Sequence, residues 1–258
     1  MTPDPSTYRP LLAPRVRPVA LVLLMLVISM IVMLAVRYAD QDMPGHLDRS
    51  LDALIRSHLR PDQPLTQALV SLGNPPEAAL LVVAVAGAAA AVRRWSGVLL
   101  TIGGTVTAVI STELILKPLV GRLRYGHLSF PSGHTTAVAA VACAAAILLG
   151  GARWPRHLAL RVAAGLVPVA LAGSVAISLV AQHIHYTTDT VAGYGVALAA
   201  VLAVALVLDY VVPRCTGAWS TLARSPRAGG GNRLAAGSGA VHGNAQPAAS
   251  RHIRRPGS

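Results

Sequence analysis

The feature that most constrains this chain is a series of long apolar runs with almost no charged residue. A helix needs about 20 mostly apolar residues to cross the hydrocarbon core of a bilayer. Six runs approach that length, and only Glu113 interrupts one of them: residues 19–36, 78–92, 96–116, 135–149, 162–181 and 190–208. We therefore predict an all-α fold, a polytopic membrane bundle of six transmembrane helices. The run at 78–92 is the shortest candidate and needs flanking residues to complete its span.

Composition favours a membrane protein over soluble and nucleic-acid-binding classes. Apolar residues make up 53% of the chain and charged residues only 12%, far from the soluble average. The formal charge is +12, but aromatic residues are 4% and the arginines are scattered, so no nucleic-acid partner is expected. The run at 19–36 follows three arginines, as a signal peptide would. It is long for a signal core and no small-residue cleavage pattern follows it, so we interpret it as an anchor.

The distribution of arginine and lysine predicts the orientation. Six spans place both termini on one side, and basic residues favour the cytoplasmic side. With the termini inside, the cytoplasmic segments hold 15 of the 22 basic residues and the outer loops hold seven. We predict an integral protein of the plasma membrane with both termini in the cytoplasm.

The chain divides into three parts: a cytoplasmic N-terminus (1–17), a six-span membrane domain (18–211) and a basic tail (212–258). The tail is rich in Gly, Ala, Ser and Arg and has no acid, so we expect it to be disordered in the cytoplasm. In the outer loop 37–76, Leu47, Leu51 and Leu54 recur at helical spacing. This helix either lies at the membrane surface or packs on the bundle.

Two outer segments, 117–134 and 182–189, hold polar residues suited to an anionic ligand. Lys117 is the only lysine of the chain. Its compact ammonium suits a phosphate, and Arg124 can add bidentate hydrogen bonds. The alternative for Lys117 is an ion pair with Glu113, one helical turn earlier.

The segment Pro131-Ser132-Gly133-His134 directly precedes the fourth apolar run. Serine is a favoured N-cap, and glycine allows a ligand to approach the backbone. The free N–H groups of a helix start favour an anion. The segment therefore predicts an anion site beside the His134 imidazole.

His185 and Asp189 stand four residues apart before the last run, so on a helix they share a face. The carboxylate can then orient the imidazole, as in a nucleophilic site. A helix-capping Asp beside an interfacial histidine is the alternative. A zinc site is less favoured, because Lys117 and Arg124 would repel a cation.

These residues resemble the three motifs of the type 2 phosphatidic acid phosphatase superfamily. Lys117 with Arg124 resembles the first, 131–134 is similar to the second, and Ser178, His185 and Asp189 resemble most of the third. There are two departures. Tyr125 replaces the proline that usually follows the first motif, and Leu179 replaces a phosphate-binding arginine. Arg122 or His183 is a candidate substitute for that cation.

The resemblance implies a membrane lipid phosphatase that uses no metal and no cofactor. His185 would attack phosphorus, Asp189 would fix its tautomer, and His134 would act as acid and then base. Lys117, Arg124, Ser132 and Gly133 would hold the phosphoryl oxygens. The partner would be a lipid phosphate in the membrane: phosphatidic acid, phosphatidylglycerol phosphate, or a polyprenyl phosphate or diphosphate. The site would face the extracytoplasmic side.

Two other functions stay open. The segment 185–189 resembles that of sphingolipid headgroup transferases, so a lipid phosphotransferase is the alternative. A scaffold or transporter with a decayed site is suggested only by Leu179. The sequence does not indicate an oligomeric state.

Overall fold

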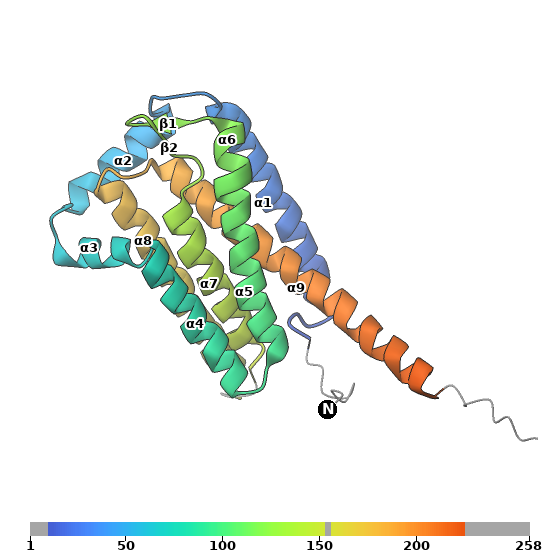
Figure 1. The fold of residues 1–258 in the computed structure, drawn as a ribbon. Coiled ribbons are helices and arrows are strands. Elements are labelled where there is room, and N and C mark those ends of the chain that lie inside the picture. Colours follow the sequence, from blue (N-terminus) through green and yellow to red (C-terminus); the bar gives the residue numbers. More distant parts are fainter. Residues whose placement is uncertain (1–9, 153–155, 225–258) are drawn as a thin grey trace, which may run out of the picture.

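The computed structural model describes residues 10–152 and 156–224, which form a helical bundle with one small β-hairpin at one end (Figure 1). The elements in chain order are α1 (Arg17–Tyr38), α2 (His46–His58), α3 (Pro64–Ser71), α4 (Pro75–Ala91), α5 (Trp95–Ile110), the π-helical segment η2 (Ser111–Leu116), α6 (Lys117–Val120), β1 (Leu123–Arg124), β2 (His127–Leu128), α7 (Gly133–Gly150), α8 (Leu158–Ala181) and α9 (Thr187–Arg224). The predicted helical membrane fold is confirmed.

The spans follow the predicted order, with one of them broken. Five helical stretches in the described part of the chain are long and apolar enough to cross a membrane: Arg17–Tyr38, Trp95–Val120, Gly133–Gly150, Leu158–Ala181 and Thr187–Val211. A sixth span results if α3 and α4 count together, although they meet at an angle of 69°. The weakest predicted run is therefore α4, and α3 continues it at a sharp bend.

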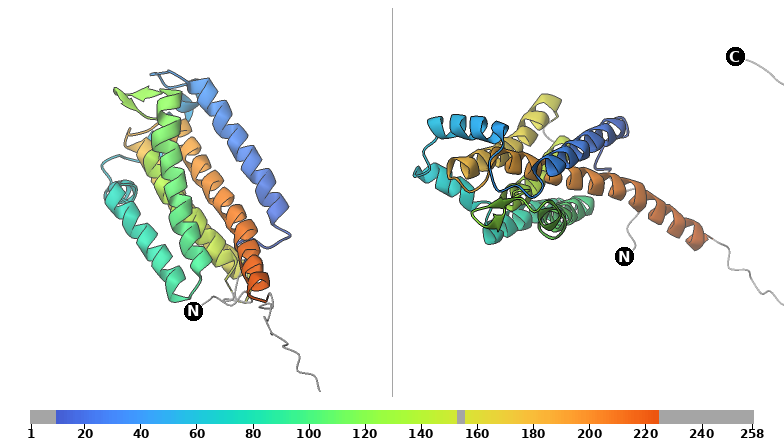
Figure 2. Two further views of the ribbon diagram at one scale, coloured as in Figure 1. Left: turned by 45° about the vertical axis from the view of Figure 1, so that its right-hand side comes forward. Right: turned by 90° about the horizontal axis from the view of Figure 1, so that it is seen from above.

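Helix α7 lies inside the bundle and packs against α4, α5, α8 and α9 (Figures 1 and 2). Small residues make these contacts close, since Ala139, Ala140 and Ala144 of α7 have no exposed surface. A Cβ atom at Gly104 of α5 would lie 3.0 Å from Val201 of α9. Small residues at such crossings let backbones approach, which is the usual basis of helix association in membranes.

Helix α2 caps one end of the bundle with its polar face turned inward. Asp48 and Asp52 are 0% and 1% exposed, whereas Leu47 and Leu54 are 58% and 57% exposed. The predicted amphipathic helix is therefore present, and it packs on the bundle through acids rather than through leucines. The outward leucine face suits a helix that also lies at the membrane surface.

The hairpin stands beside α2 at the same end, and the sequence did not predict it. Leu123 pairs with Leu128, and Arg124 pairs with His127. The two turn residues are Tyr125 (φ 47°) and Gly126 (φ 78°). Because both adopt the left-handed conformation, the turn joins two antiparallel strands tightly.

The N-terminal segment and the last helix meet at the other end of the bundle (Figure 1). The N–H groups of Leu11 and Leu12 donate to the Asp209 carboxylate at 2.7 and 2.9 Å, and Arg17 pairs with it at 3.3 Å. Helix α9 continues to Arg224, beyond the predicted end of the last span. The rest of the predicted tail, 225–258, lies outside the described residues.

Candidate active site

The start of α7 forms one wall of the site. Ser132 is the N-cap, and its hydroxyl accepts the N–H of Thr135 at 3.3 Å. The Ser132 N–H donates to the carbonyl of Asp189 at 3.0 Å, which ties the start of α7 to the start of α9. The predicted helix start at 131–134 is thus present in the structure.

Glycine is required at position 133. A Cβ atom there would collide with the Glu113 carboxylate, and it would lie 3.6 Å from Nζ of Lys117. The ion pair between Lys117 and Glu113 measures 2.8 Å, so the pairing considered from the sequence is present. It stands directly against the start of α7, which places the ammonium beside the anion site predicted there.

The two histidines expected to do the chemistry face each other. The ring centroids of His134 and His185 lie 6.4 Å apart and the rings are tilted by 59°. The bend between α3 and α4 also borders this site, because a Cβ atom at Gly73 would lie 2.7 Å from Cβ of His134. The broken span therefore brings a close backbone contact to the imidazole.

Asp189 is buried in the first turn of α9 and is shared among several groups. One oxygen accepts from Arg122 at 2.7 Å, and the other accepts the N–H of Tyr186 at 3.2 Å. Nδ1 of His185 lies 3.6 Å from that second oxygen. His185 precedes the helix rather than sharing a face of it, since α9 begins at Thr187. The pairing predicted from the spacing is a close approach and not a formed hydrogen bond.

Arg122 is a fully buried residue whose contacts the sequence did not predict. Its terminal nitrogens donate to Asp48 at 2.6 Å, and to Asp189 and Thr188 at 2.7 Å each. The guanidinium lies between the rings of Tyr38 and Tyr186, 4.2 and 4.5 Å from their centroids. Arg122 therefore joins α2 to the start of α9, and its terminal nitrogens are already occupied. The sequence signal for these contacts was the pair of acids Asp48 and Asp52, which are four residues apart on the polar face of α2.

Arg124 differs from Arg122 in having no carboxylate partner within the described residues. It is 7% exposed, and its guanidinium lies 3.9 Å from the centroid of the Tyr186 ring. Nε donates to the His183 carbonyl at 3.1 Å, while Nη1 is buried with no hydrogen-bond partner. Arg124 therefore has a buried terminal donor directed at no protein acceptor, whereas both terminal nitrogens of Arg122 are occupied.

Leu179 lies in the apolar core with no exposed surface. Its carbonyl accepts the N–H of Ile184 at 2.9 Å and that of His185 at 3.4 Å. The leucine backbone thus shapes the loop that carries His185, while its side chain packs among apolar neighbours. His183, the other candidate substitute for a cation at this position, is exposed and accepts a hydrogen bond from Arg56 at 2.7 Å.

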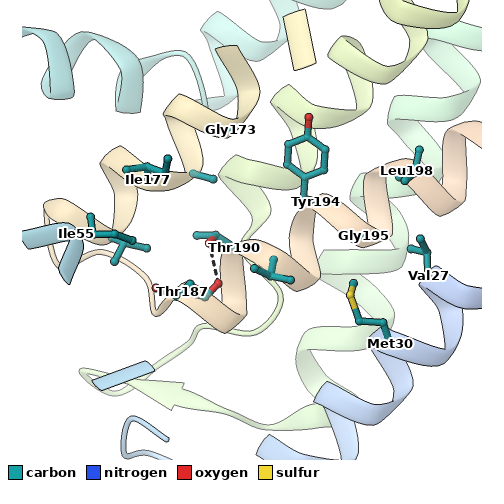
Figure 3. A pocket seen from close by; sticks show the side chains of 13 residues that line it. Val27, Met30, Ile55, Gly173, Ile177, Thr187, Thr190, Tyr194, Gly195 and Leu198 are labelled. Atoms are coloured by element: carbon teal, nitrogen blue, oxygen red, sulfur yellow. Dashed lines mark hydrogen bonds between the residues drawn. The ribbon is translucent and has the colours of Figure 1, made fainter. Parts of the chain in front are cut away.

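An apolar pocket of about 440 Å³ lies along α9 near its start (Figure 3). Met30 of α1, Ile177 of α8 and Tyr194 of α9 line it, and Ile55 of α2 closes one end. Thr187 and Thr190 border the same end, where the Thr190 hydroxyl donates to the Thr187 carbonyl at 2.8 Å. The pocket therefore reaches the turn of α9 that follows His185.

Comparison with known proteins gives a family resemblance. Residues 98–213 match the sequence model of the PAP2 superfamily. This part of the chain is therefore similar to that superfamily. The matched region runs from α5 into α9 and contains every candidate site residue from Lys117 to Asp189.

A solved structure shares the PAP2 fold of this chain. It is described as the first transmembrane PAP2-type phosphatidylglycerolphosphate phosphatase from Bacillus subtilis, with a TM-score of 0.58 and 21% sequence identity. The alignment covers 73% of this chain and 96% of that chain. A search of curated proteins gave no match.

Within the described residues, no group of three His, Cys, Asp or Glu side chains is arranged to hold a metal ion. The metal-free reaction stays a prediction, which the assay in chelator proposed below would test.

Proposed function

We propose that this protein is a lipid phosphatase that hydrolyses a phosphomonoester or diphosphate of a membrane lipid through a phosphohistidine. The observation that carries the proposal is the pair of imidazoles, His134 and His185, with ring centroids 6.4 Å apart at the start of α7. The match of residues 98–213 to the PAP2 superfamily supports a phosphatase. The similar fold of a phosphatidylglycerolphosphate phosphatase supports a lipid substrate.

In the first step Nε2 of His185 attacks phosphorus, and the bond from phosphorus to the leaving oxygen of the lipid breaks. The imidazole becomes positively charged, and the Asp189 carboxylate 3.6 Å from Nδ1 stabilises that charge. It also favours the tautomer that carries the proton on Nδ1, which leaves Nε2 free to attack. His134 protonates the leaving oxygen.

In the second step water attacks the phosphohistidine. His134, now neutral, accepts a proton from this water while the phosphorus–nitrogen bond breaks. His185 leaves as the neutral imidazole and inorganic phosphate is released. The two histidines therefore return to their starting protonation states.

Charge on the phosphoryl oxygens would be held by the residues around the start of α7. The Gly133 N–H lies in the first helical turn, where N–H groups have no partner within the helix. Ser132 holds this turn in place, and Lys117 supplies the ammonium beside it. Arg124 adds the positive charge of a buried guanidinium. Donors placed in advance at developing charge lower the barrier to reaction.

The apolar pocket along α9 suits one hydrocarbon chain of the same lipid. It lies between helices that span the membrane and reaches Thr187, two residues after His185. A lipid with its phosphate at the histidines could therefore extend a chain sideways into this pocket. This placement predicts that substrates with long chains are preferred.

The orientation also belongs to the proposal: the site faces the extracytoplasmic side of the plasma membrane. A cysteine in place of His127 on the hairpin should react with a membrane-impermeant thiol reagent in intact cells. If the cysteine reacts only after the cells are lysed, the hairpin lies on the cytoplasmic side and the proposed orientation is wrong.

The decisive experiment measures phosphate release from purified protein on phosphatidic acid, phosphatidylglycerol phosphate and a polyprenyl diphosphate in the presence of chelator. Activity should persist in chelator, and His185→Ala should lower it by at least about 10³-fold. His127→Ala is the matched control, since His127 is an exposed hairpin residue. Full activity in His185→Ala would refute the mechanism.

The same assay separates hydrolysis from transfer, because a transferase would yield a new phospholipid instead of inorganic phosphate. The threonines of segment 185–189 that resemble headgroup transferases have structural partners here. Thr187 and Thr188 donate to Asp52 and Asp48 of α2. These contacts give both threonines a role that requires no second lipid.

A further inference from the structure

A second pocket, of about 400 Å³, lies beside the candidate site between α2, the hairpin and the loop before α9. Its lining includes Arg49, Asp52 and Arg56 of α2, Arg124 of β1, and His183 of the loop, together with the phenol side chains of Tyr125 and Tyr186. We call this the arginine pocket. None of its residues other than Arg124 has a role in the reaction described above.

The arginine pocket carries an excess of positive charge. Asp52 is its only acid, and both oxygens of Asp52 are occupied. One pairs with Arg56 at 2.9 Å, and the other accepts from the Thr187 N–H and hydroxyl at 3.0 and 2.6 Å. Within the described part of the chain, Arg49 and Arg124 have no carboxylate partner. Two positive charges therefore face the pocket without a counter-ion.

Arg124 provides the sign that a ligand is missing. Its Nη1 is buried without an acceptor, although the residue is only 7% exposed. A buried donor left unsatisfied costs free energy, and charged donors cost more than neutral ones. An anionic oxygen in the pocket would remove that cost.

His183 reports on the charge of the same pocket. Nδ1 accepts a hydrogen bond from Arg56 at 2.7 Å, and the residue adopts φ 59°. Partial burial, then Arg56 and then Arg124 lower the pKa of His183, and only Asp52 acts in the opposite direction. A bound anion would add a second opposing charge and raise that pKa.

The arginine pocket adjoins the site along the chain and in space. Tyr186, which lines it, directly follows His185, and Arg124 lies over the Tyr186 ring at 3.9 Å.

We propose that the arginine pocket binds a second phosphate of the substrate headgroup while the terminal phosphate lies at His185. The inference rests on the proposed function and narrows its substrate class to lipids with two phosphate groups. These are either separated by a spacer, as in phosphatidylglycerol phosphate, or directly linked, as in a polyprenyl diphosphate.

The first experiment compares kcat/KM for each two-phosphate lipid with kcat/KM for phosphatidic acid, in mixed micelles. Arg49→Gln should lower this ratio by about tenfold, because one cation facing the second phosphate is lost. Arg49 is exposed and has no ion pair within the described residues, so the fold should be retained. Arg56→Gln should lower the ratio in the same direction.

Arg60→Gln is the matched control. Arg60 is an exposed arginine just after α2 and does not line the pocket. A ratio that stays constant in Arg49→Gln, or falls equally in Arg60→Gln, would overturn the proposal, because general attraction to anionic micelles would then suffice. Which of the two lipids loses more in Arg49→Gln distinguishes the spaced headgroup from the diphosphate.

A binding measurement separates failure of this inference from failure of the proposed function. In His185→Ala protein, the His183 imidazole is titrated by NMR with and without inorganic pyrophosphate. We expect pyrophosphate to raise the pKa of His183, and Arg49→Gln to weaken that binding by about tenfold. An unchanged pKa of His183 would refute phosphate binding in the arginine pocket, even if the enzyme is an active phosphatase. A raised pKa of His183 in His185→Ala, together with no hydrolysis of any lipid phosphate by the unsubstituted protein, would support the pocket and refute the proposed function.

Discussion

Arg122 and Arg124 are two residues apart, both are buried, and their surroundings are opposite. Arg122 has a carboxylate on each side, Asp48 at 2.6 Å and Asp189 at 2.7 Å. Arg124 has a backbone carbonyl, an aromatic ring and one buried nitrogen without an acceptor. A buried cation balanced by acids holds the fold together, whereas one that lacks an acid is available to an anionic ligand.

The same distinction separates two regions of this end of the bundle. Where α2 meets the start of α9, the acids Asp48 and Asp52 are occupied by hydrogen bonds from α9 and by arginines. Around the start of α7, His134 and His185 face each other across 6.4 Å without a direct bond. The first region is expected to govern stability and the second to govern activity.

The largest expected effect is that of Arg122→Met. Removing the guanidinium leaves Asp48 and Asp189 buried without their common partner, which should cost about 3–5 kcal/mol of unfolding free energy. Denaturant unfolding of the purified protein in detergent measures this. Arg124→Met is the matched control and should lose activity with little loss of stability. Equal stability losses in the two variants would remove the contrast between the two arginines.

A comparison of Asp189→Asn with Asp48→Asn sharpens the contrast between stability and activity. Both carboxylates are fully buried and both pair with Arg122, but only Asp189 approaches His185. Asp189→Asn should therefore lower kcat on the order of 10²-fold beyond the effect of Asp48→Asn. Turnover per folded protein is measured for each variant. Equal turnover would mean that Asp189 serves only the helix start.

Lys117 and Glu113 test whether their ion pair is structural or holds a phosphate site. Lys117→Gln should weaken inhibition by inorganic phosphate by about tenfold, because one ammonium beside Gly133 is lost. Glu113→Gln should strengthen inhibition, because it frees the ammonium of its carboxylate. Inhibition constants measured in chelator decide between the two roles, and weaker inhibition in both variants would favour a purely structural pair.

The smallest effect is expected in the apolar pocket. A Cβ atom at Gly173 has no neighbour within 4 Å, so Gly173→Leu should fill part of the pocket without displacing a helix. We expect kcat/KM to fall a few-fold for a long-chain lipid and to stay unchanged for a short-chain analogue. Gly87→Leu is the control, since Gly87 is an exposed glycine of α4 with equal space around it. A similar loss of kcat/KM in both variants would indicate that the hydrocarbon chain of the lipid binds elsewhere.

The sequence alone predicted the parts of this protein that depend on local pattern. Span length and charge-free runs predicted the helices, because each spanning helix must satisfy its own backbone within the bilayer. The start of α7 at Ser132 followed from capping chemistry. The motif residues predicted the resemblance to the PAP2 superfamily, and helical spacing offered the pairing of Lys117 with Glu113 as an alternative to phosphate binding.

Only the tertiary structure decided how these elements meet. The contact of Gly73 with His134 joins segments that are distant along the chain. The sequence showed the leucine stripe of α2. It did not show that the acids of α2 would face the bundle. Arg122 joins Asp48 of α2 to Asp189 of α9. It is 74 residues from Asp48 and 67 residues from Asp189 along the chain. A periodic pattern shows which face of a helix is polar, whereas the partner of a buried charge is determined by packing.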